Sequence, residues 1–328
     1  GAVLPVSPIS TSVLVARAIH AGLIHPQSAG SSLSASPQLT CTPAPCALPN
    51  VQASGGGQPV NEDPIAVNPK KSVQLLSGGN DYNCATIQGF YSSSNGGTTW
   101  SHVCLAALSG AFGDGDPIVG YDLNNTSYIG GIDGNTTPDG YDIVFEKSTN
   151  NGATWSAPAI AVKPFFSGGL TDKPWLQIDT IATSPHVNTL YISVTQFDAN
   201  NNSQITVSHS SNGGSTWTTT AVDTEQLFPN VDQFSDIAIG KDGTVYVSWM
   251  RCTANGPTND CGGTTATMEE SKSTDGGSTW SAPVIMSSVA LAPDTCGGFY
   301  GCVPNTSERV SNVPAIGIDN STGPNAGH

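Results

Sequence analysis

Four aspartates that stand at the start of apolar, strand-like runs are the first candidates for chemistry. They occur in Asp63-Pro-Ile-Ala-Val, Asp116-Pro-Ile-Val-Gly, Asp172-Lys-Pro-Trp-Leu and Asp232-Gln-Phe-Ser-Asp236. Carboxylates at matching positions of a repeated fold would form a partial ring, which can bind a cation or supply the acid and base of a glycosidase. The alternative is that an Asp in front of such a run simply begins a turn. No spacing among these residues, Asp236 included, selects one catalytic pair.

Three other residues are candidates for holding a ligand. Arg251 can bind a carboxylate through a bidentate guanidinium contact. Trp175 and Trp249 lie on expected strands, where their rings would stack on a sugar or, as the alternative, fill the core. The six histidines show no spacing typical of a metal site or a catalytic triad.

One segment, Asp133-Gly-Asn135-Thr-Thr-Pro-Asp139-Gly, alternates oxygen-bearing side chains as calcium-binding loops do. It lacks the glycine at the sixth position and the glutamate at the twelfth that such loops use. A polar hairpin loop is therefore the competing interpretation. The sequence assigns no cofactor with certainty, and calcium is the first ion to test.

The eight cysteines form four close pairs and predict disulfides. None has the Cys-x-x-Cys spacing and no histidines cluster beside them, so the pattern argues against zinc. Disulfides persist in oxidising compartments, which predicts a secreted or cell-surface protein. The expected neighbour pairs are Cys41–Cys46, Cys84–Cys104, Cys252–Cys261 and Cys296–Cys302.

Composition favours an all-β fold for the 328 residues. Charged residues make up only 11%, whereas 37 Gly and 23 Pro suit short strands joined by tight turns. The net charge of −15 would repel phosphate backbones and anionic lipid, so neither nucleic acid nor a membrane surface is expected as a partner. A run of 18 apolar residues, which membrane insertion requires, does not occur.

One eight-residue turn occurs four times and organises the chain. Its pattern is Ser-x-[Asn/Asp]-x-Gly-x-Thr-Trp, and its tryptophans follow one another at intervals of 55, 62 and 63 residues. Asn, Asp and Gly tolerate the left-handed backbone that such a turn needs, and the Trp begins the next strand. The third and eighth residues of the four copies are Asn95 and Trp100, Asn150 and Trp155, Asn212 and Trp217, and Asp275 and Trp280.

This turn resembles the Asp-box, or BNR, repeat of sialidase-like β-propellers, over roughly residues 60–328. The resemblance implies four-stranded antiparallel blades at about 60–106, 112–163, 170–223 and 230–288, with a fifth that begins at about residue 308. Six blades would close such a ring, so the sequence is expected to be part of a longer chain. In this family the boxes are structural and lie away from the active centre.

Sialidases of this family bind the sugar carboxylate with three arginines and use a Tyr–Glu nucleophile pair with an Asp as acid and base. The corresponding first-blade phrase here, Asp63-Pro-Ile65, contains no arginine. Glu308-Arg309 is the one place where this sequence resembles the family's catalytic residues, so both residues are added to the catalytic candidates. Sialic-acid hydrolysis is therefore not expected.

Residues 1–59 differ in composition from the rest of the chain. They are rich in Ser, Pro and Gly and contain an apolar stretch at 11–20. This extension is expected to pack on a neighbouring propeller or to add a strand to one. The resulting hypothesis is a secreted, non-catalytic propeller module that self-associates or binds another extracellular protein, with carbohydrate as a further ligand. A secreted glycoside hydrolase is the alternative.

Overall fold

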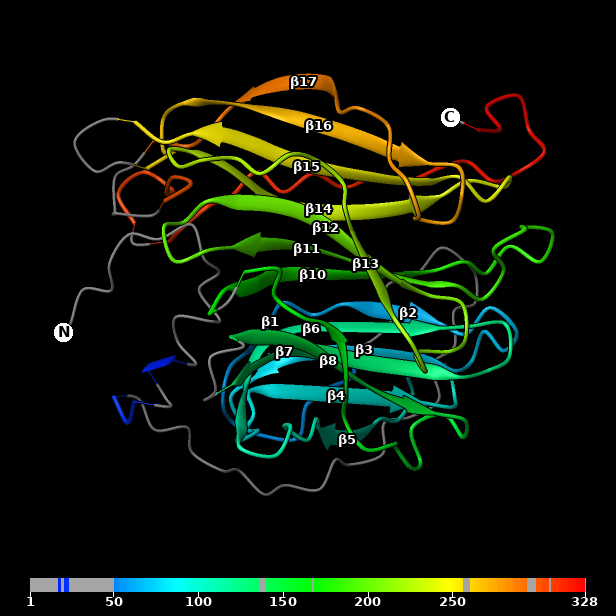
Figure 1. Ribbon diagram of the computed structural model, residues 1–328. Coiled ribbons are helices and arrows are strands. Elements are labelled where there is room, and N and C mark those ends of the chain that lie inside the picture. Colours follow the sequence, from blue (N-terminus) through cyan, green and yellow to red (C-terminus); the bar gives the residue numbers. More distant parts are fainter. Residues whose placement is uncertain are drawn as a thin grey trace. The chain divides into compact units, whose positions relative to one another are not determined.

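A computed structural model describes residues 17–18, 21–23, 50–135, 140–166, 168–255, 260–293, 299–306 and 308–327. Seventeen strands dominate it and form three hydrogen-bonded sheets, of five, eight and four strands (Figure 1). In the eight-stranded sheet, one parallel pairing, Leu170 with Tyr141, joins β10 to β8. The strands are described here as four consecutive groups, called blades one to four. The all-β fold expected from composition is thus confirmed. Blade one contains β1 (Val60–Asn61), β2 (Ile65–Val67), β3 (Leu75–Asp81), β4 (Gln88–Ser93) and β5 (Ser101–Cys104). Blade two contains β6 (Ala111–Tyr121), β7 (Ser127–Asn135), β8 (Tyr141–Ser148) and β9 (Ala159–Val162). Blade three contains β10 (Leu170–Ile178), β11 (Leu190–Phe197), β12 (Ser203–Ser210) and β13 (Thr218–Ala221). Blade four contains β14 (Asn230–Ile239), β15 (Val245–Thr253), β16 (Thr265–Ser273) and β17 (Val284–Ala290).

The chain divides into two compact units, each with its own apolar core. The first unit comprises Val15–Gly134 and Val144–Ile160, and the second comprises Gly1–Leu14, Asn135–Ile143 and Ala161–His328. Alternating residues of facing sheets build both cores, since every second side chain of a strand points to the same face. The first core contains Leu76, Phe90, Leu105, Val119, Tyr121, Ile129 and Val144. The second contains Tyr191, Ile205, Val207, Val222, Ile237, Ile239, Val245, Val247 and Trp249.

The repeated eight-residue turn has the same hydrogen bonds in all four copies. Its Ser Oγ accepts the N–H of the Gly four residues later at 2.8 to 2.9 Å. The side-chain oxygen of Asn or Asp accepts the N–H of the Thr at 2.9 Å. That Gly has a φ of 80 to 90° in every copy, a conformation that costs glycine little because it has no Cβ. The sequence pattern therefore encodes one specific turn.

Asparagine replaces aspartate in three copies because the Thr hydroxyl can reverse its role. Asn95 donates its Nδ2–H to Thr99 Oγ1 at 2.8 Å. In the fourth copy Thr279 donates its hydroxyl to Asp275 Oδ2 at 2.6 Å. Hydrogen bonds from Thr279 and Ser273 lower the pKa of exposed Asp275 to about 2. Its oxygens are thus occupied within the turn, in agreement with a structural role.

The turns also attach each blade to its neighbour within a unit. Trp280 packs against the second core and donates its indole N–H to Thr220 Oγ1 of β13 at 3.0 Å. The same Thr220 hydroxyl donates to the carbonyl of Gly277 at 2.8 Å. In the first unit Asn151 donates to the carbonyl of Ser93, in the preceding turn, at 3.2 Å. A turn therefore closes its own hairpin and contacts the blade before it.

The first strands of blades three and four contain β-bulges, and each first strand has a residue with left-handed backbone in it or beside it. In β10 the register shifts between Asp172 and Trp175, and in β14 between Gln233 and Asp236. In a non-glycine residue this conformation persists only where surrounding structure enforces it. These residues are Glu62 (57°), Asp116 (53°), Lys173 (50°) and Phe234 (64°).

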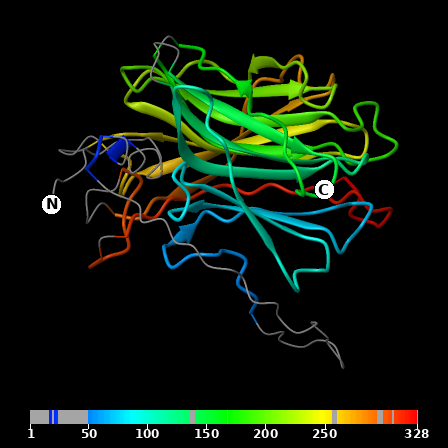
Figure 2. The same ribbon diagram turned by 90° about the horizontal axis from the view of Figure 1, so that it is seen from below.

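The segment expected to open a fifth blade forms no strand. Residues 310–320 are extended and carry no arrow in the ribbon (Figures 1 and 2). Their contacts are to β14, where Ile316 donates its N–H to Asp236 Oδ2 at 2.9 Å and Asn320 donates to the carbonyl of Ile239 at 2.9 Å. The alternation of apolar residues in this segment predicts extended backbone, but it does not determine whether the segment hydrogen-bonds to a neighbouring strand.

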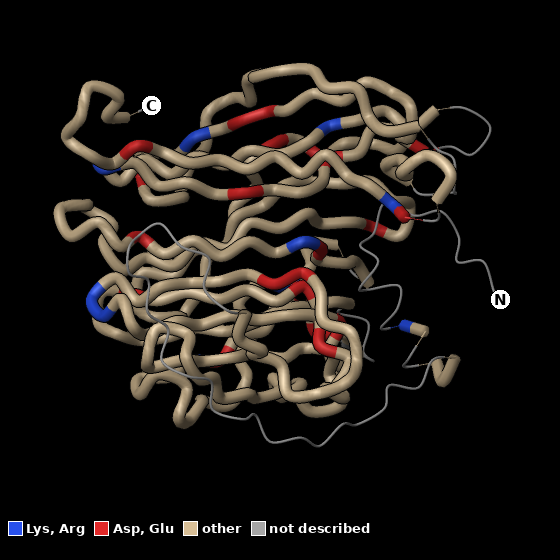
Figure 3. The backbone as a smooth tube through the Cα atoms, turned by 180° about the vertical axis from the view of Figure 1, so that it is seen from behind, with Lys and Arg blue, Asp and Glu red and all other residues tan. Residues whose placement is uncertain are grey.

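Two predicted disulfides are present, Cys84–Cys104 and Cys252–Cys261. Cys302 is disulfide-bonded as well, whereas its expected partner Cys296 and the pair Cys41–Cys46 lie outside the described residues. Charged positions are sparse along the backbone, as composition requires (Figure 3). Among the described residues there is no helix with the length and apolarity needed to cross a bilayer.

Removing one turn serine tests the hydrogen-bond pattern. We expect Ser273→Ala to lower the free energy of unfolding by about 1–3 kcal/mol, because the buried N–H of Gly277 loses its acceptor. Ser278→Ala, an exposed serine of the same turn, should change it by less than about 0.5 kcal/mol. Equal effects of the two substitutions in denaturant titrations would contradict the structural role of the buried hydroxyl.

Candidate functional site

Arg251 and Asp232 form the centre of the most highly charged cluster in the second unit. Asp232 on β14 and Arg251 on β15 are directly paired in the antiparallel register, so their side chains lie on the same face of the sheet. Arg251 donates from Nε to Asp232 Oδ1 at 2.7 Å and from one terminal nitrogen to Asp232 Oδ2 at 2.8 Å. This is the bidentate geometry that a planar guanidinium favours with a carboxylate.

Two more carboxylates surround the same guanidinium. The terminal nitrogens of Arg251 lie 3.3 Å from Asp223 Oδ2 and 2.9 Å from Glu269 Oε2. Asp223 follows β13 and Glu269 lies on β16, so the cluster draws on both blades of the unit. The Arg251 side chain is 26% exposed, while the three acidic side chains are at most 4% exposed.

Binding of a proton lowers the negative charge of this cluster. Three ionised carboxylates against one guanidinium would leave a buried net negative charge, which is costly. Burial raises the pKa of Asp223, and a hydrogen bond and charge repulsion from Asp232 raise it further. Burial also raises the pKa of Glu269, against the attraction of Arg251. Burial alone would lower the pKa of Arg251, but its acidic neighbours raise it. Of these groups, Asp223 is the one whose pKa both burial and the neighbouring carboxylate raise, so we expect it to bind the proton.

A second polar group lies beside this cluster and contains Asp172, Gln233 and Tyr300. Gln233 donates an amide hydrogen from Nε2 to Asp172 Oδ2 at 2.7 Å. Tyr300 is fully buried and its ring packs edge-on against Phe234 with centroids 4.9 Å apart. Burial raises the pKa of the Tyr300 hydroxyl, and the charges of Asp172 and Asp232 add to this while Arg309 opposes it. Asp172, Asp232 and Arg309 thus share one electrostatic environment.

The closest pair of carboxylates in this cluster is held by the guanidinium. Asp223 Oδ2 and Asp232 Oδ2 contact the same terminal nitrogen of Arg251, at 3.3 and 2.8 Å. Nε and both terminal nitrogens of Arg251 contact carboxylates of its own chain. Its guanidinium is thereby committed to the fold, which disfavours its predicted role as a clamp for a ligand carboxylate.

The four aspartates predicted to form a ring are not at equivalent positions. Relative to the left-handed residue of each first strand, Asp63 follows by one residue and Asp116 occupies the position itself. Asp172 precedes it by one residue and Asp232 by two. The four aspartates thus occupy different positions relative to these left-handed residues, and the ring of carboxylates stays a prediction. Asp63 is exposed, while the other three are buried.

The two candidate tryptophans have opposite environments. Trp249 is fully buried in the second core, which agrees with the alternative that its ring fills the core and leaves no face for a sugar. Trp175 is 44% exposed and stands directly after the β10 bulge. Its cross-strand partner is the small polar residue Ser193. Trp175 is thus an accessible aromatic side chain that lies opposite a serine in the sheet.

The remaining candidates are only partly described. Asp133 is buried in β7 and its Oδ2 accepts the N–H of Leu108 at 2.7 Å, so this oxygen serves the fold. The side chain of Asn135 and all of Asp139 lie outside the described residues, and the calcium loop stays a prediction. Glu308 is exposed, and the half-buried Arg309 pairs through its backbone with Cys302.

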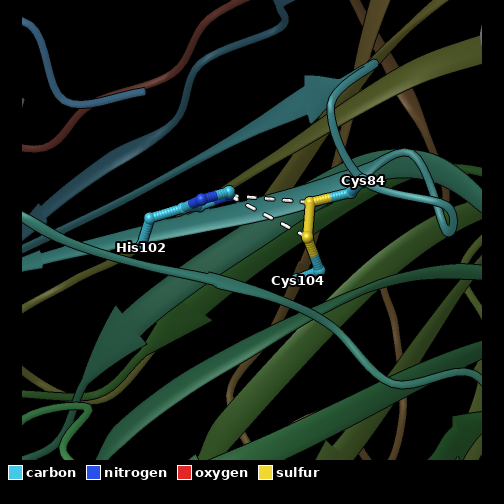
Figure 4. A group of neighbouring side chains, drawn as sticks. All are labelled: Cys84, His102 and Cys104. Atoms are coloured by element: carbon cyan, nitrogen blue, oxygen red, sulfur yellow. Dashed lines mark hydrogen bonds between the residues drawn. A yellow bond between two sulfur atoms is a disulfide. The ribbon is translucent and has the colours of Figure 1, made fainter. Parts of the chain in front are cut away.

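A histidine does stand beside one cysteine pair, contrary to the sequence analysis. His102 Nε2 lies 3.6 Å from Cys84 Sγ and 4.0 Å from Cys104 Sγ (Figure 4). Asp81 Oδ2 lies 3.3 Å from the same nitrogen. Burial favours a higher pKa for Asp81, but hydrogen bonds from His102, Tyr91 and Asn83 outweigh it and lower the pKa to about 2. With both sulfurs in a disulfide, the group offers no thiolate to a metal.

Several residues of these clusters were missed by sequence reasoning. Asp223, Glu269 and Tyr300 follow no motif, although Glu269 occupies a buried position of a strand, which is itself unusual for a carboxylate. His102 and Cys104 are two residues apart on one strand and so share a face. The spacing of His102 and Cys104 could therefore have been recognised in the sequence. The position of Cys84 beside them depends on the tertiary structure.

Comparisons with known proteins support the fold. No protein-family model matches the chain, and no curated protein does. The α-L-arabinanase of Penicillium chrysogenum, solved with arabinobiose, superposes with a TM-score of 0.51 at 14% identity, covering 80% of this chain and 72% of its own. A Hadza microbial sialidase gives a TM-score of 0.44 at 12% identity and covers 71% of this chain. This chain spans 59% of that sialidase and 51% of a leech intramolecular trans-sialidase.

Identities this low show the fold alone. Together with the antiparallel sheets, they show an all-β fold similar to that of the arabinanase. The Asp223–Asp232–Arg251–Glu269 cluster and the exposed Trp175 are its principal candidate sites.

The shared proton predicts a pH-dependent stability. Because the pKa of Asp223 is raised in the folded state, the folded protein binds more protons than the unfolded chain above about pH 4. Its free energy of unfolding should therefore fall as pH rises from about 4 into the alkaline range. Asp223→Asn should remove this part of the slope in denaturant titrations, whereas the surface-turn control Asp198→Asn should retain it. Identical slopes in wild type and Asp223→Asn would refute proton binding by Asp223.

Proposed function

We propose that this chain is an Asp-box propeller that binds carbohydrate without cleaving it, as a module of an extracellular or cell-surface assembly. The observation that carries the proposal is Trp175, a large aromatic ring exposed after the β10 bulge. Flat apolar rings flanked by polar groups suit the faces of sugars. The arabinobiose bound by the P. chrysogenum arabinanase supports carbohydrate as the ligand class.

The absence of catalysis is supported by how the strongest charged groups are used. The Arg251 guanidinium is occupied by three carboxylates of its own chain. The Tyr300 hydroxyl is fully buried, which does not suit a nucleophile that must reach a sugar. The two disulfides in the described residues agree with an oxidising, extracellular compartment.

Oligosaccharide binding provides the direct test. Trp175→Ala should weaken binding of arabino- or sialo-oligosaccharides at least about tenfold in calorimetry, because one stacking surface is lost. Ile285→Ala removes an apolar side chain that is 66% exposed on β17 and should leave affinity unchanged. A glycan array on which wild type and Trp175→Ala bind alike, or neither binds, would refute the proposal.

A glycoside hydrolase is the second candidate, favoured by the shared environment of Asp172, Asp232, Arg309 and Tyr300. Incubation with the same oligosaccharides distinguishes the two functions. Release of reducing sugar that is lost in Asp172→Asn would establish hydrolysis and overturn the non-catalytic proposal. Binding without release would support it.

The proposed assembly also includes self-association through residues 1–59. β17 ends its sheet and exposes Val284, Ile285 and Met286, so it offers an apolar edge to which a strand can be added. Val13→Asp combined with Val15→Asp should convert oligomers to monomers in analytical ultracentrifugation, since charges oppose burial of that segment. Ser31→Asp is the matched control within the extension and should leave the oligomers intact. A wild-type protein that is monomeric at all concentrations would exclude this mode.

A further inference from the structure

The edge of blade one gathers three groups that bind soft metals. His102 and Cys104 lie on the same face of β5, two residues apart. Cys84 reaches them from the turn after β3, and its Sγ lies 3.6 Å from His102 Nε2. The imidazole and the two sulfurs converge in Figure 4. All three candidate ligand atoms lie within 4.8 Å of one another.

We propose that the Cys84–Cys104 disulfide masks a metal site, which binds Zn²⁺ through both thiolates and His102 Nε2 once the disulfide is reduced. Zn²⁺ takes thiolate at about 2.3 Å and imidazole at about 2.0 Å in tetrahedral geometry, which places ligand atoms about 3.5–3.8 Å apart. The distance of 3.6 Å from Nε2 to Cys84 Sγ matches the nitrogen–sulfur spacing, while the 4.0 Å to Cys104 Sγ must shorten by a few tenths of an ångström. The two sulfurs must also separate, and breaking their bond permits it.

The histidine is held in place independently of the disulfide. Its ring stacks on Tyr91 with centroids 5.2 Å apart and an interplanar angle of 21°. Asp81 lies 3.3 Å from Nε2 and is itself fixed by the Tyr91 hydroxyl at 2.6 Å. The stacking on Tyr91 orients the ring, whereas the contact between Nε2 and Asp81 must give way when Nε2 binds the metal. The Asp81 carboxylate also adds negative charge next to the site, which favours a cation.

Opening the site is an ordinary thiol–disulfide exchange. Cys104 is exposed and Cys84 is buried, so a thiolate reductant reaches the Cys104 sulfur first. Attack there forms a mixed disulfide, and the electron pair of the broken bond passes to Cys84, which takes a proton. A second reductant thiol then releases Cys104 and leaves as the oxidised disulfide. Two protein thiols result, and Zn²⁺ binding displaces their two protons.

Metal titration of oxidised and reduced protein tests the proposal. The protein is reduced anaerobically with a dithiol, freed of reductant and titrated with Zn²⁺ or Cd²⁺, with the thiolate-to-metal absorption band as readout. We expect one ion per chain at this site after reduction and no such band before it. In Cys252→Ser/Cys261→Ser, which lacks a pair whose cysteines are both buried, the site should persist.

His102→Ala distinguishes a folded site from adventitious thiol binding. Reduced His102→Ala should bind at least about tenfold more weakly, since one of three ligands is removed. Equal affinity of His102→Ala and wild type would overturn the proposal, as would no binding by reduced wild type. Loss of the β-sheet circular dichroism on reduction would also overturn it, because the site requires folded β3 and β5.

Discussion

A buried serine hydroxyl that accepts the N–H of a glycine four residues later recurs at the same place in each of the four blades. This contact holds the turn between the last two strands of each blade and allows the glycine its left-handed φ. The Trp that follows can then be directed at a core, as Trp280 is. Apolar side chains alone would leave the register of these short strands weakly defined. The rest of the architecture depends on these turns.

The scarcity of cations creates a second constraint. The sequence has three arginines and seven lysines but 25 acidic residues, and many of these acids are buried. Hydrogen bonds, a shared cation or a bound proton can stabilise such buried carboxylates. Hydrogen bonds stabilise Asp81 in blade one and lower its pKa. The pKa of Asp223, between blades three and four, is raised instead, which favours a bound proton. Arg251 is central because three carboxylates compete for it.

Much of the fold could be predicted because its signals are local. The turn motif, the alternation of β11 and β15 and the close cysteine pairs each depend on residues near in sequence. The site could not be predicted to the same extent. Asp63, Asp116, Asp172 and Asp232 look alike in sequence, yet each has a different position relative to the left-handed residue of its first strand, and Trp175 and Trp249 share an expected role but not an environment. Single-residue shifts of register are invisible in composition and reverse the face that a side chain occupies.

The sequence by itself determined the all-β class, the four-fold repeat of one turn and the disulfides between neighbouring cysteines, because spacing along the chain limits which backbone geometries can form. Only the tertiary structure decided which charges meet. Asp223, Asp232, Arg251 and Glu269 come from four separate places in the chain, and His102 joins Cys84 across two strands. Burial and distance set the protonation and reactivity of these groups, and both quantities exist only once the sheets have packed.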